Sequence, residues 1–91
     1  MTKLEEKLIE LGYELEVIKD EWANIYIYHF EKYIKYYNNS LVIQLSEEKK
    51  IISFYVVNSG LFDDTTDINN LQQAFNQLQN DLEVLKQDES S

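Results

Sequence analysis

The feature that most constrains the fold is an amphipathic segment near the C-terminus. Its apolar residues recur at spacings of 3, 4, 3, 4 and 3 positions, at Ile68, Leu71, Phe75, Leu78, Leu82 and Leu85. This spacing is one stripe of an α-helix, and Gln and Asn residues occupy the opposite side. The pattern predicts a helix over residues 67–87, capped by Thr66 or Asp67 and followed by a frayed tail at 88–91. A helix with one apolar stripe needs an apolar layer to cover.

The same heptad spacing also occurs in coiled coils, where charges beside the seam specify the pairing. Here the residues beside the stripe are mostly Gln and Asn, with few complementary charges. We therefore expect the helix to pack on a sheet of its own chain. A homodimer through the remainder of the helix stays an alternative, so the sequence allows a monomer or a homodimer.

A second, shorter helix is predicted at the start of the chain. Thr2 and Glu5 have the spacing of a capping box, in which each side chain bonds the other's backbone amide. Leucines at positions 4, 8 and 11 then form one apolar stripe, and Gly12 suits the left-handed residue that ends many helices. The helix is expected over residues 3–11.

Between the helices the pattern changes to that of β-strands. Alternating, β-branched and aromatic residues separated by polar turns predict three or four strands, over residues 13–18, from 25 to 33 or beyond, 41–45 and 51–57. Residues 33–37 fit a bulge or a helical turn as well as a strand. Turns are expected at 19–21, 37–40 and 47–50.

This order of elements predicts an α+β fold in a single domain, residues 1–91. A short N-terminal helix precedes an antiparallel sheet of three to four strands, and the long C-terminal helix packs on the sheet. The strand around residue 27 has apolar residues on both sides, Ile25 and Ile27 against Tyr26 and Tyr28. That favours a sheet covered on both faces, and whether both helices lie on one face stays open.

The net charge and the absence of cysteine argue against several classes of function. The chain has eight Lys and Arg residues against seventeen Asp and Glu, a net charge of −9, and no cysteine. Without cysteine there is no disulfide scaffold, thiolate zinc site or cysteine nucleophile. The acidity lies at the two ends, −4 over residues 1–21 and −6 over 59–91, while residues 22–58 carry +1. Acidic flanks argue against direct binding to nucleic acid, which needs Lys and Arg to neutralise phosphates.

Neither a targeting signal nor a membrane span is expected. Residues 1–6 are charged and lack the apolar core of a signal peptide, and no apolar run approaches the ~20 residues of a membrane-spanning helix. We therefore expect a cytoplasmic protein.

No motif in the chain predicts catalysis, a metal or a cofactor. His29, the single histidine, lies in a predicted strand with no nucleophile at a recognised spacing, so we interpret it as a hydrogen-bonded strand residue. Asp63, Thr65 and Asp67 alternate like the first ligands of a calcium loop. The sixth and twelfth positions of that loop would be Ile68 and Ala74 in place of Gly and Glu. We therefore expect a protein that is not an enzyme.

The aromatic residues indicate a candidate protein-binding surface. Residues 22–37 hold seven of the twelve aromatic side chains, interleaved with a few basic ones. A small core cannot bury them all, and tyrosine is common at protein interfaces. The candidate residues are Tyr26, Tyr28, Tyr33, Tyr36 and Tyr37.

Both ends of the chain resemble a group of phage proteins. The segments Lys3-Leu4-Glu5-Glu6-Lys7-Leu8-Ile9-Glu10-Leu11-Gly12-Tyr13 and residues 68–86, beginning Ile68-Asn69-Asn70-Leu71-Gln72-Gln73, carry the resemblance. They are similar to segments of small, functionally unassigned proteins of phages and prophages of low-GC Gram-positive bacteria. The resemblance implies an accessory protein of a mobile element that binds a host protein. It carries no catalytic motif and transfers no functional residue.

Two functions follow as hypotheses. The first is a non-enzymatic accessory protein that acts by binding another protein. The alternative is an acidic mimic of nucleic acid that inhibits a host DNA-binding protein or nuclease. That alternative needs carboxylates in one stripe, and the candidate acidic surface comprises Glu6, Glu10, Asp63, Asp64, Asp81 and Glu83.

Overall fold

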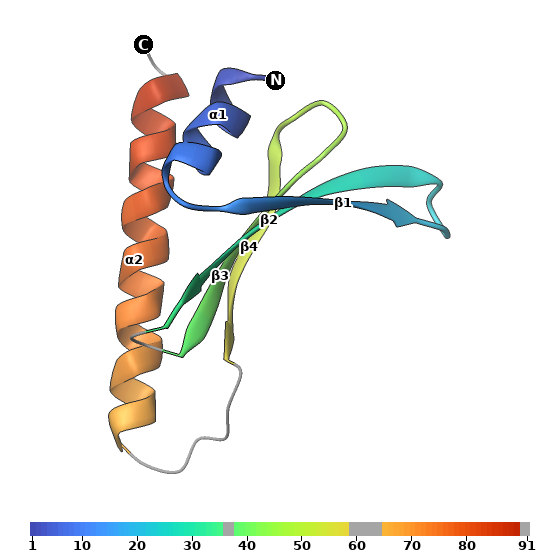
Figure 1. The fold of residues 1–91 in the computed structure, drawn as a ribbon. Helices are drawn as coiled ribbons and strands as arrows, with labels where there is room; N and C mark the ends of the chain where they lie inside the picture. The colour runs from blue at the N-terminus through green and yellow to red at the C-terminus, as the bar shows by residue number, and fades with distance from the viewer. Residues whose placement is uncertain (36–37, 59–64, 90–91) are drawn as a thin grey trace.

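The computed structural model describes residues 1–35, 38–58 and 65–89 (Figure 1). Its elements in chain order are α1 (Lys3–Glu10), β1 (Glu14–Asp20), β2 (Ile25–Ile34), β3 (Asn39–Leu45), β4 (Ile51–Asn58) and α2 (Thr65–Glu89). The strands form one antiparallel sheet, and the long helix packs on it. The predicted α+β fold is confirmed.

The sheet is a simple meander in which each strand pairs with its neighbour in the sequence. The strand order is β1-β2-β3-β4, so β1 and β4 are the two edge strands. β2 continues regularly through residue 33 to Ile34, without a bulge. Lys35 is a turn residue whose carbonyl oxygen accepts from the Asn38 amide at 3.2 Å, and residues 36 and 37 lie outside the described part of the chain. The first predicted turn lies later than expected, because β1 stays paired with β2 as far as Asp20.

Both helices lie on the same face of the sheet, so the expectation that both faces are covered is wrong (Figure 1). Phe30 of β2 and Ile43 of β3 are opposite each other on this helix-covered face, and Leu8 of α1 and Leu78 of α2 pack in the same buried cluster. The turn from α1 to β1 is too short to carry α1 to the far side. Gly12 adopts a φ of +102° there, and the Tyr13 amide donates to the Leu8 carbonyl oxygen at 3.0 Å.

The opposite face, here called the open face, has no helix over it among the described residues. Strand alternation assigns to it Glu14, Glu16, Ile18 and Asp20 of β1, Ile25, Ile27, His29, Glu31 and Tyr33 of β2, Ser40, Val42 and Gln44 of β3, and Ser53, Tyr55 and Val57 of β4. Val42 at its centre is fully buried, whereas the flanking side chains Tyr33 and Tyr55 are exposed.

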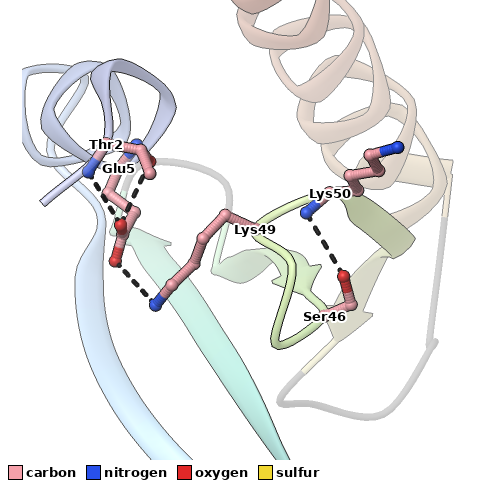
Figure 2. Close-up of polar contacts among 5 residues, drawn as sticks. All are labelled: Thr2, Glu5, Ser46, Lys49 and Lys50. Carbon is pink, nitrogen blue, oxygen red and sulfur yellow. Dashed lines mark hydrogen bonds and ion pairs between the residues drawn. The ribbon is translucent and has the colours of Figure 1, made fainter.

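The start of α1 is tied to the β3–β4 turn by the buried side chain of Glu5 (Figure 2). The predicted capping box is present: the Glu5 amide donates to Thr2 Oγ1 at 3.2 Å, and the Thr2 amide donates to Glu5 Oε1 at 2.9 Å. Lys49 Nζ, from the turn, lies 3.3 Å from Glu5 Oε2 and 3.0 Å from the centroid of the Tyr28 ring. Burial alone raises the pKa of Glu5, but these hydrogen bonds and the Lys49 charge outweigh it, and the net pKa is lowered.

Candidate functional site

The β1–β2 hairpin is longer than the rest of the sheet and projects from it as an arm (Figure 1). β1 pairs with β2 as far as the Asp20–Ile25 pair, whereas β3 pairs with β2 only from Tyr28 onward. Residues 18–27, here called the hairpin arm, therefore have two strands and no third strand beside them among the described residues. The arm is the part of the molecule that reaches farthest from the helices.

The tip of the arm is a turn that Asp20 organises. Its Oδ1 accepts hydrogen bonds from the amides of Trp22, at 3.0 Å, and Ala23, at 3.2 Å. Asn24 follows in the left-handed region with a φ of 55°, which asparagine tolerates better than most residues. This geometry holds Trp22 at the tip, where its side chain is 100% exposed.

The arm carries apolar side chains on both of its sides. Ile18 and Ile25 lie on the open face, Tyr26 lies on the other face, and all three are more than a third exposed. A two-stranded hairpin is marginally stable by itself, and large apolar side chains gain free energy when they leave water. Together with Trp22, these residues form an exposed apolar group on a projecting element. The arm is therefore the candidate binding site.

Carboxylates surround the base of the arm on the open face. Glu14 is directly opposite Glu31 in the β1–β2 ladder, and Glu16 is opposite His29. A hollow of about 380 Å³ lies beside these four residues. Like charges opposite each other destabilise a sheet. Among the described strand residues no Lys or Arg is assigned to this face, although Lys32 of the helix-covered face also lines the hollow, so a positively charged partner would relieve the repulsion further.

His29 belongs to a chain of polar side chains that crosses the open face. Its Nε2 lies 2.9 Å from Glu31 Oε1, and its Nδ1 lies 2.9 Å from Gln44 Nε2. The Ser53 hydroxyl in turn donates to Gln44 Oε1 at 2.7 Å. Because an amide nitrogen can only donate, Gln44 donates to Nδ1, while Nε2 faces the Glu31 carboxylate. Both ring nitrogens are thus used in hydrogen bonds within the sheet, in agreement with the interpretation of His29 as a strand residue.

The predicted tyrosine surface does not form one patch. Tyr26 is exposed on the helix-covered side of the arm, Tyr28 is half-buried against the core, and Tyr33 is exposed on the open face. Tyr33 donates its hydroxyl hydrogen bond to Asn38 Oδ1 at 2.8 Å. Tyr36 and Tyr37 lie outside the described residues.

The predicted acidic surface contains one residue that is not on the surface. Asp81 is 3% exposed, and its Oδ2 accepts hydrogen bonds from Tyr13 Oη at 2.8 Å and Lys32 Nζ at 2.7 Å. Asp81 therefore belongs to the interior, because its charge is paired there. Glu6, Glu10 and Glu83 are exposed, on two different helices, and Asp63 and Asp64 lie outside the described residues.

Sequence reasoning misses two parts of the candidate site. It counts Trp22 only as part of the aromatic segment 22–37 and leaves it out of the candidate surface, whereas Trp22 is at the tip of the arm. The signal that could have found it is the polar segment 19–24 around it. The carboxylates of the open face, Glu14, Glu16 and Glu31, are absent from the predicted acidic set. Strand alternation places the first two on one side, but only the register of β1 on β2 brings Glu31 beside them.

The described part of the chain contains no group of three or more His, Asp or Glu side chains close enough together to hold a metal ion. None of the described helices has the length and apolar character that crossing a membrane would require. No protein-family model, curated protein or solved structure matches the chain.

Proposed function

We propose that the protein is a non-enzymatic accessory protein that binds another protein through its hairpin arm. The observation that carries the proposal is Trp22, fully exposed at the tip of a projecting, ordered turn. Tryptophan is among the residues that contribute most to protein interfaces when it is buried there. A partner with an apolar pocket for Trp22 would bury the largest exposed side chain of the chain.

The two sides of the arm define how such a partner contacts it. Ile18 and Ile25 face one way and Tyr26 the other, so a partner that grips the arm from both sides buries all three. Contact from one side only would leave half of this apolar surface in water. The partner surface is therefore expected to be a cleft that receives the arm.

The charges around the arm define the chemistry of the partner. Glu14, Glu16 and Glu31 lie at the base of the arm, and Glu21 is in its turn. A basic rim around an apolar cleft complements this arrangement, and it would also speed association by electrostatic steering. The resemblance of the chain ends to phage and prophage proteins supports a host protein as this partner.

The nucleic-acid mimic is less well supported by the geometry. Asp81 is neutralised by Lys32 in the interior and presents no charge to a partner. Glu10 is paired with Lys7 at 3.4 Å. The predicted stripe of carboxylates thus loses one of its six members, and a second has a cation beside it.

The proposal is tested by replacing Trp22 with a photo-reactive amino acid and irradiating the protein in a lysate of its source organism. The matched control places the same amino acid at Ile9, an exposed apolar position on α1. We expect a discrete cross-linked protein from position 22 only. Equal cross-linking from both positions, or none from position 22, would contradict the proposal.

The captured protein then permits a quantitative test with purified components. Trp22→Ala should weaken binding by at least about 30-fold, the effect of losing about 2 kcal/mol at an interface hot spot. Ile9→Ala should leave the affinity unchanged. Added salt should weaken the wild-type complex moderately, because carboxylates contribute to binding alongside apolar contacts. An affinity that does not respond to Trp22→Ala would refute the assignment of the arm.

A further inference from the structure

The two edges of the sheet differ in a way that bears on assembly. Edge strands have unpaired backbone groups that can pair with another chain, and charged side chains are a common protection against this. β1 carries four charged residues among its seven, Glu14, Glu16, Lys19 and Asp20. β4 has the sequence IISFYVVN and carries none. One edge is protected by charge, and the other is not.

Beside the uncharged edge lies an apolar groove. It has a volume of about 430 Å³ and is formed by Phe54 and Tyr55 of β4 together with Phe75, Leu78 and Leu82 of α2. Phe54 and Phe75 are 55% and 50% exposed, although both are large apolar side chains. Ile68, Phe75 and Leu82 follow one another at intervals of seven and so lie along one side of α2, and Phe75 and Leu82 line the groove together with Gln79 and Glu83.

We infer that β4 and this side of α2 are the interface through which two copies of the chain form a symmetric dimer. In the dimer the two β4 strands pair antiparallel and join the two sheets into one of eight strands. The α2 helices then lie on the same side of the joined sheet, and each Phe75 faces the groove beside the other copy. This interface is separate from the hairpin arm, and the inference does not depend on the proposed function.

The charge distribution allows a second copy to occupy this surface. Two chains of net charge −9 repel each other unless they meet where neither carries charge. β4 is such a place, whereas the open face and the arm present carboxylates. Glu83 is the one charged residue among those that line the groove in the described part of the chain.

The size of the surface also suits a dimer. Six side chains of β4 and α2 are each 40–58% exposed: Ile52, Phe54, Tyr55, Val57, Ile68 and Phe75. With 150–250 Å² for each aromatic side chain and somewhat less for each aliphatic one, they expose roughly 600 Å² per copy. The paired backbone edge adds to this, and standard interfaces bury about 800 Å² per partner.

Symmetry restricts how the strands can pair. Directly opposite residues of an antiparallel pair lie on the same face, so the two-fold axis must pass beside a residue of β4 and place that residue opposite itself. Pairing about Phe54, for example, sets Phe54 against Phe54 on the helix-covered face and Ser53 against Tyr55 on the open face. One position of β4 is therefore expected to lie within about 4.5–5.5 Å of its own copy, Cα to Cα.

The first experiment measures the mass of the full chain in solution by sedimentation equilibrium, between about 1 and about 300 μM. We expect a reversible dimer for the wild type. Phe54→Glu and Phe75→Glu should each weaken dimerisation by at least about 30-fold, and Val17→Glu, on the other edge strand, should leave it unchanged. Far-UV circular dichroism shows whether each variant is folded. Because the two substitutions are on different elements, one folded variant is enough to test the inference. A wild type that stays monomeric, or a dimer that resists both folded variants, would overturn the inference.

The second experiment uses the absence of cysteine from the natural chain. Single cysteines are introduced at each position from 52 to 57, with Val17→Cys as the control on β1. The Cα–Cα distance expected between the two copies of the residue at the two-fold axis is within the range for a disulfide. We expect fast oxidation to a covalent dimer at one position, with slow oxidation at its two neighbours and at the control. Oxidation no faster at any β4 position than at Val17→Cys would show that the strands do not pair.

Discussion

Lys32 of β2 and Asp81 of α2 form an ion pair with an Nζ–Oδ2 distance of 2.7 Å, although 49 positions separate them in the sequence. Tyr13 donates to the same carboxylate oxygen, and the Lys32 ammonium also donates to the Leu11 carbonyl at 3.0 Å. Gln77 Nε2 donates to the other carboxylate oxygen at 3.0 Å. This cluster joins the α1–β1 turn, the second strand and the long helix at one point.

Removal of Asp81 should therefore destabilise the protein strongly. Asp81→Ala leaves the Lys32 charge largely buried without its carboxylate, and we expect the free energy of unfolding to fall by about 3–5 kcal/mol. The measurement is urea unfolding followed by circular dichroism. Glu83→Ala, two positions farther along the same helix and exposed, should change it by less than about 0.5 kcal/mol. Equal effects of the two substitutions would show that the ion pair does not stabilise the fold.

The same cluster makes stability sensitive to alkaline pH. Burial, followed by the hydrogen bond to Asp81 and its charge, raises the pKa of Tyr13 well above its usual 10.0. Above about pH 10 the unfolded chain releases this proton while the folded chain keeps it. Stability should therefore fall with rising pH, with a contribution from Tyr13 of up to about 1.4 kcal/mol per pH unit.

Tyr13→Phe isolates that contribution. The variant should be less stable than the wild type at pH 8, since it lacks the hydrogen bond to a charged group, by about 1.5–3 kcal/mol. At pH 11 the difference should be smaller, because only the wild type loses stability through this tyrosine. Tyr26→Phe, on the exposed arm, should follow the wild type at both pH values. A Tyr13→Phe difference that is constant with pH would contradict the prediction.

Glu5 makes the stability of the protein sensitive to acid pH. Its pKa is lowered in the folded protein, so its contribution is present above the ordinary value of 4.5 and is lost as pH falls through the folded value. Glu5→Gln should cost about 1.5–3 kcal/mol at pH 6, where the charged side chain accepts from Thr2 and Lys49, and less at pH 3. Unfolding by urea at both pH values tests this. The control Glu6→Gln, on the exposed side of α1, should have little effect on the free energy of unfolding at either pH. A cost of Glu5→Gln that is larger at pH 3 than at pH 6 would contradict the prediction.

The packing of α2 on the sheet is tested at Leu78, which is 2% exposed. Leu78→Ala should reduce the unfolding free energy by about 2–5 kcal/mol through the lost contacts and the cavity. Leu78→Asp should unfold the protein, because a buried charge with no partner costs more than a small domain can supply. Gln73→Asp, on the exposed side of α2, serves as the control. Unchanged thermal stability of Leu78→Asp would show that the helix stands away from the sheet.

The fold was predictable where local patterns decide the structure. The capping box at Thr2 and Glu5 and the alternation of the strands depend on neighbouring residues, and each gives an element close to its expected bounds. The heptad pattern located α2 and part of its buried side, since Leu78 and Leu85 are in the core and Leu82 packs against it. Ala74 and Asp81 are in the core, whereas Ile68 and Phe75, both counted in the apolar stripe, are exposed. Hydrophobicity alone cannot show that a carboxylate will meet a lysine of another element.

The candidate site was less predictable, for a related reason. Which residues gather on one face of a sheet depends on the register between strands, and which strand is longest depends on where pairing stops. Trp22 is at the tip of an arm only because β3 ends its pairing at Tyr28. Whether the two helices cover the same face or opposite faces of the sheet depended on the short turn at Gly12, which keeps α1 on the side of α2.

The meander order of the strands has a consequence for how the chain folds. All three strand pairings join neighbours in the sequence, so the sheet can form from local hairpins without waiting for distant segments. The contacts that span the chain include those of α2, such as Asp81 with Lys32 and with Tyr13. During synthesis the whole sheet leaves the ribosome before the helix that covers it. For that interval the apolar side chains of the helix-covered face are exposed, and the docking of α2 is the event that completes the core.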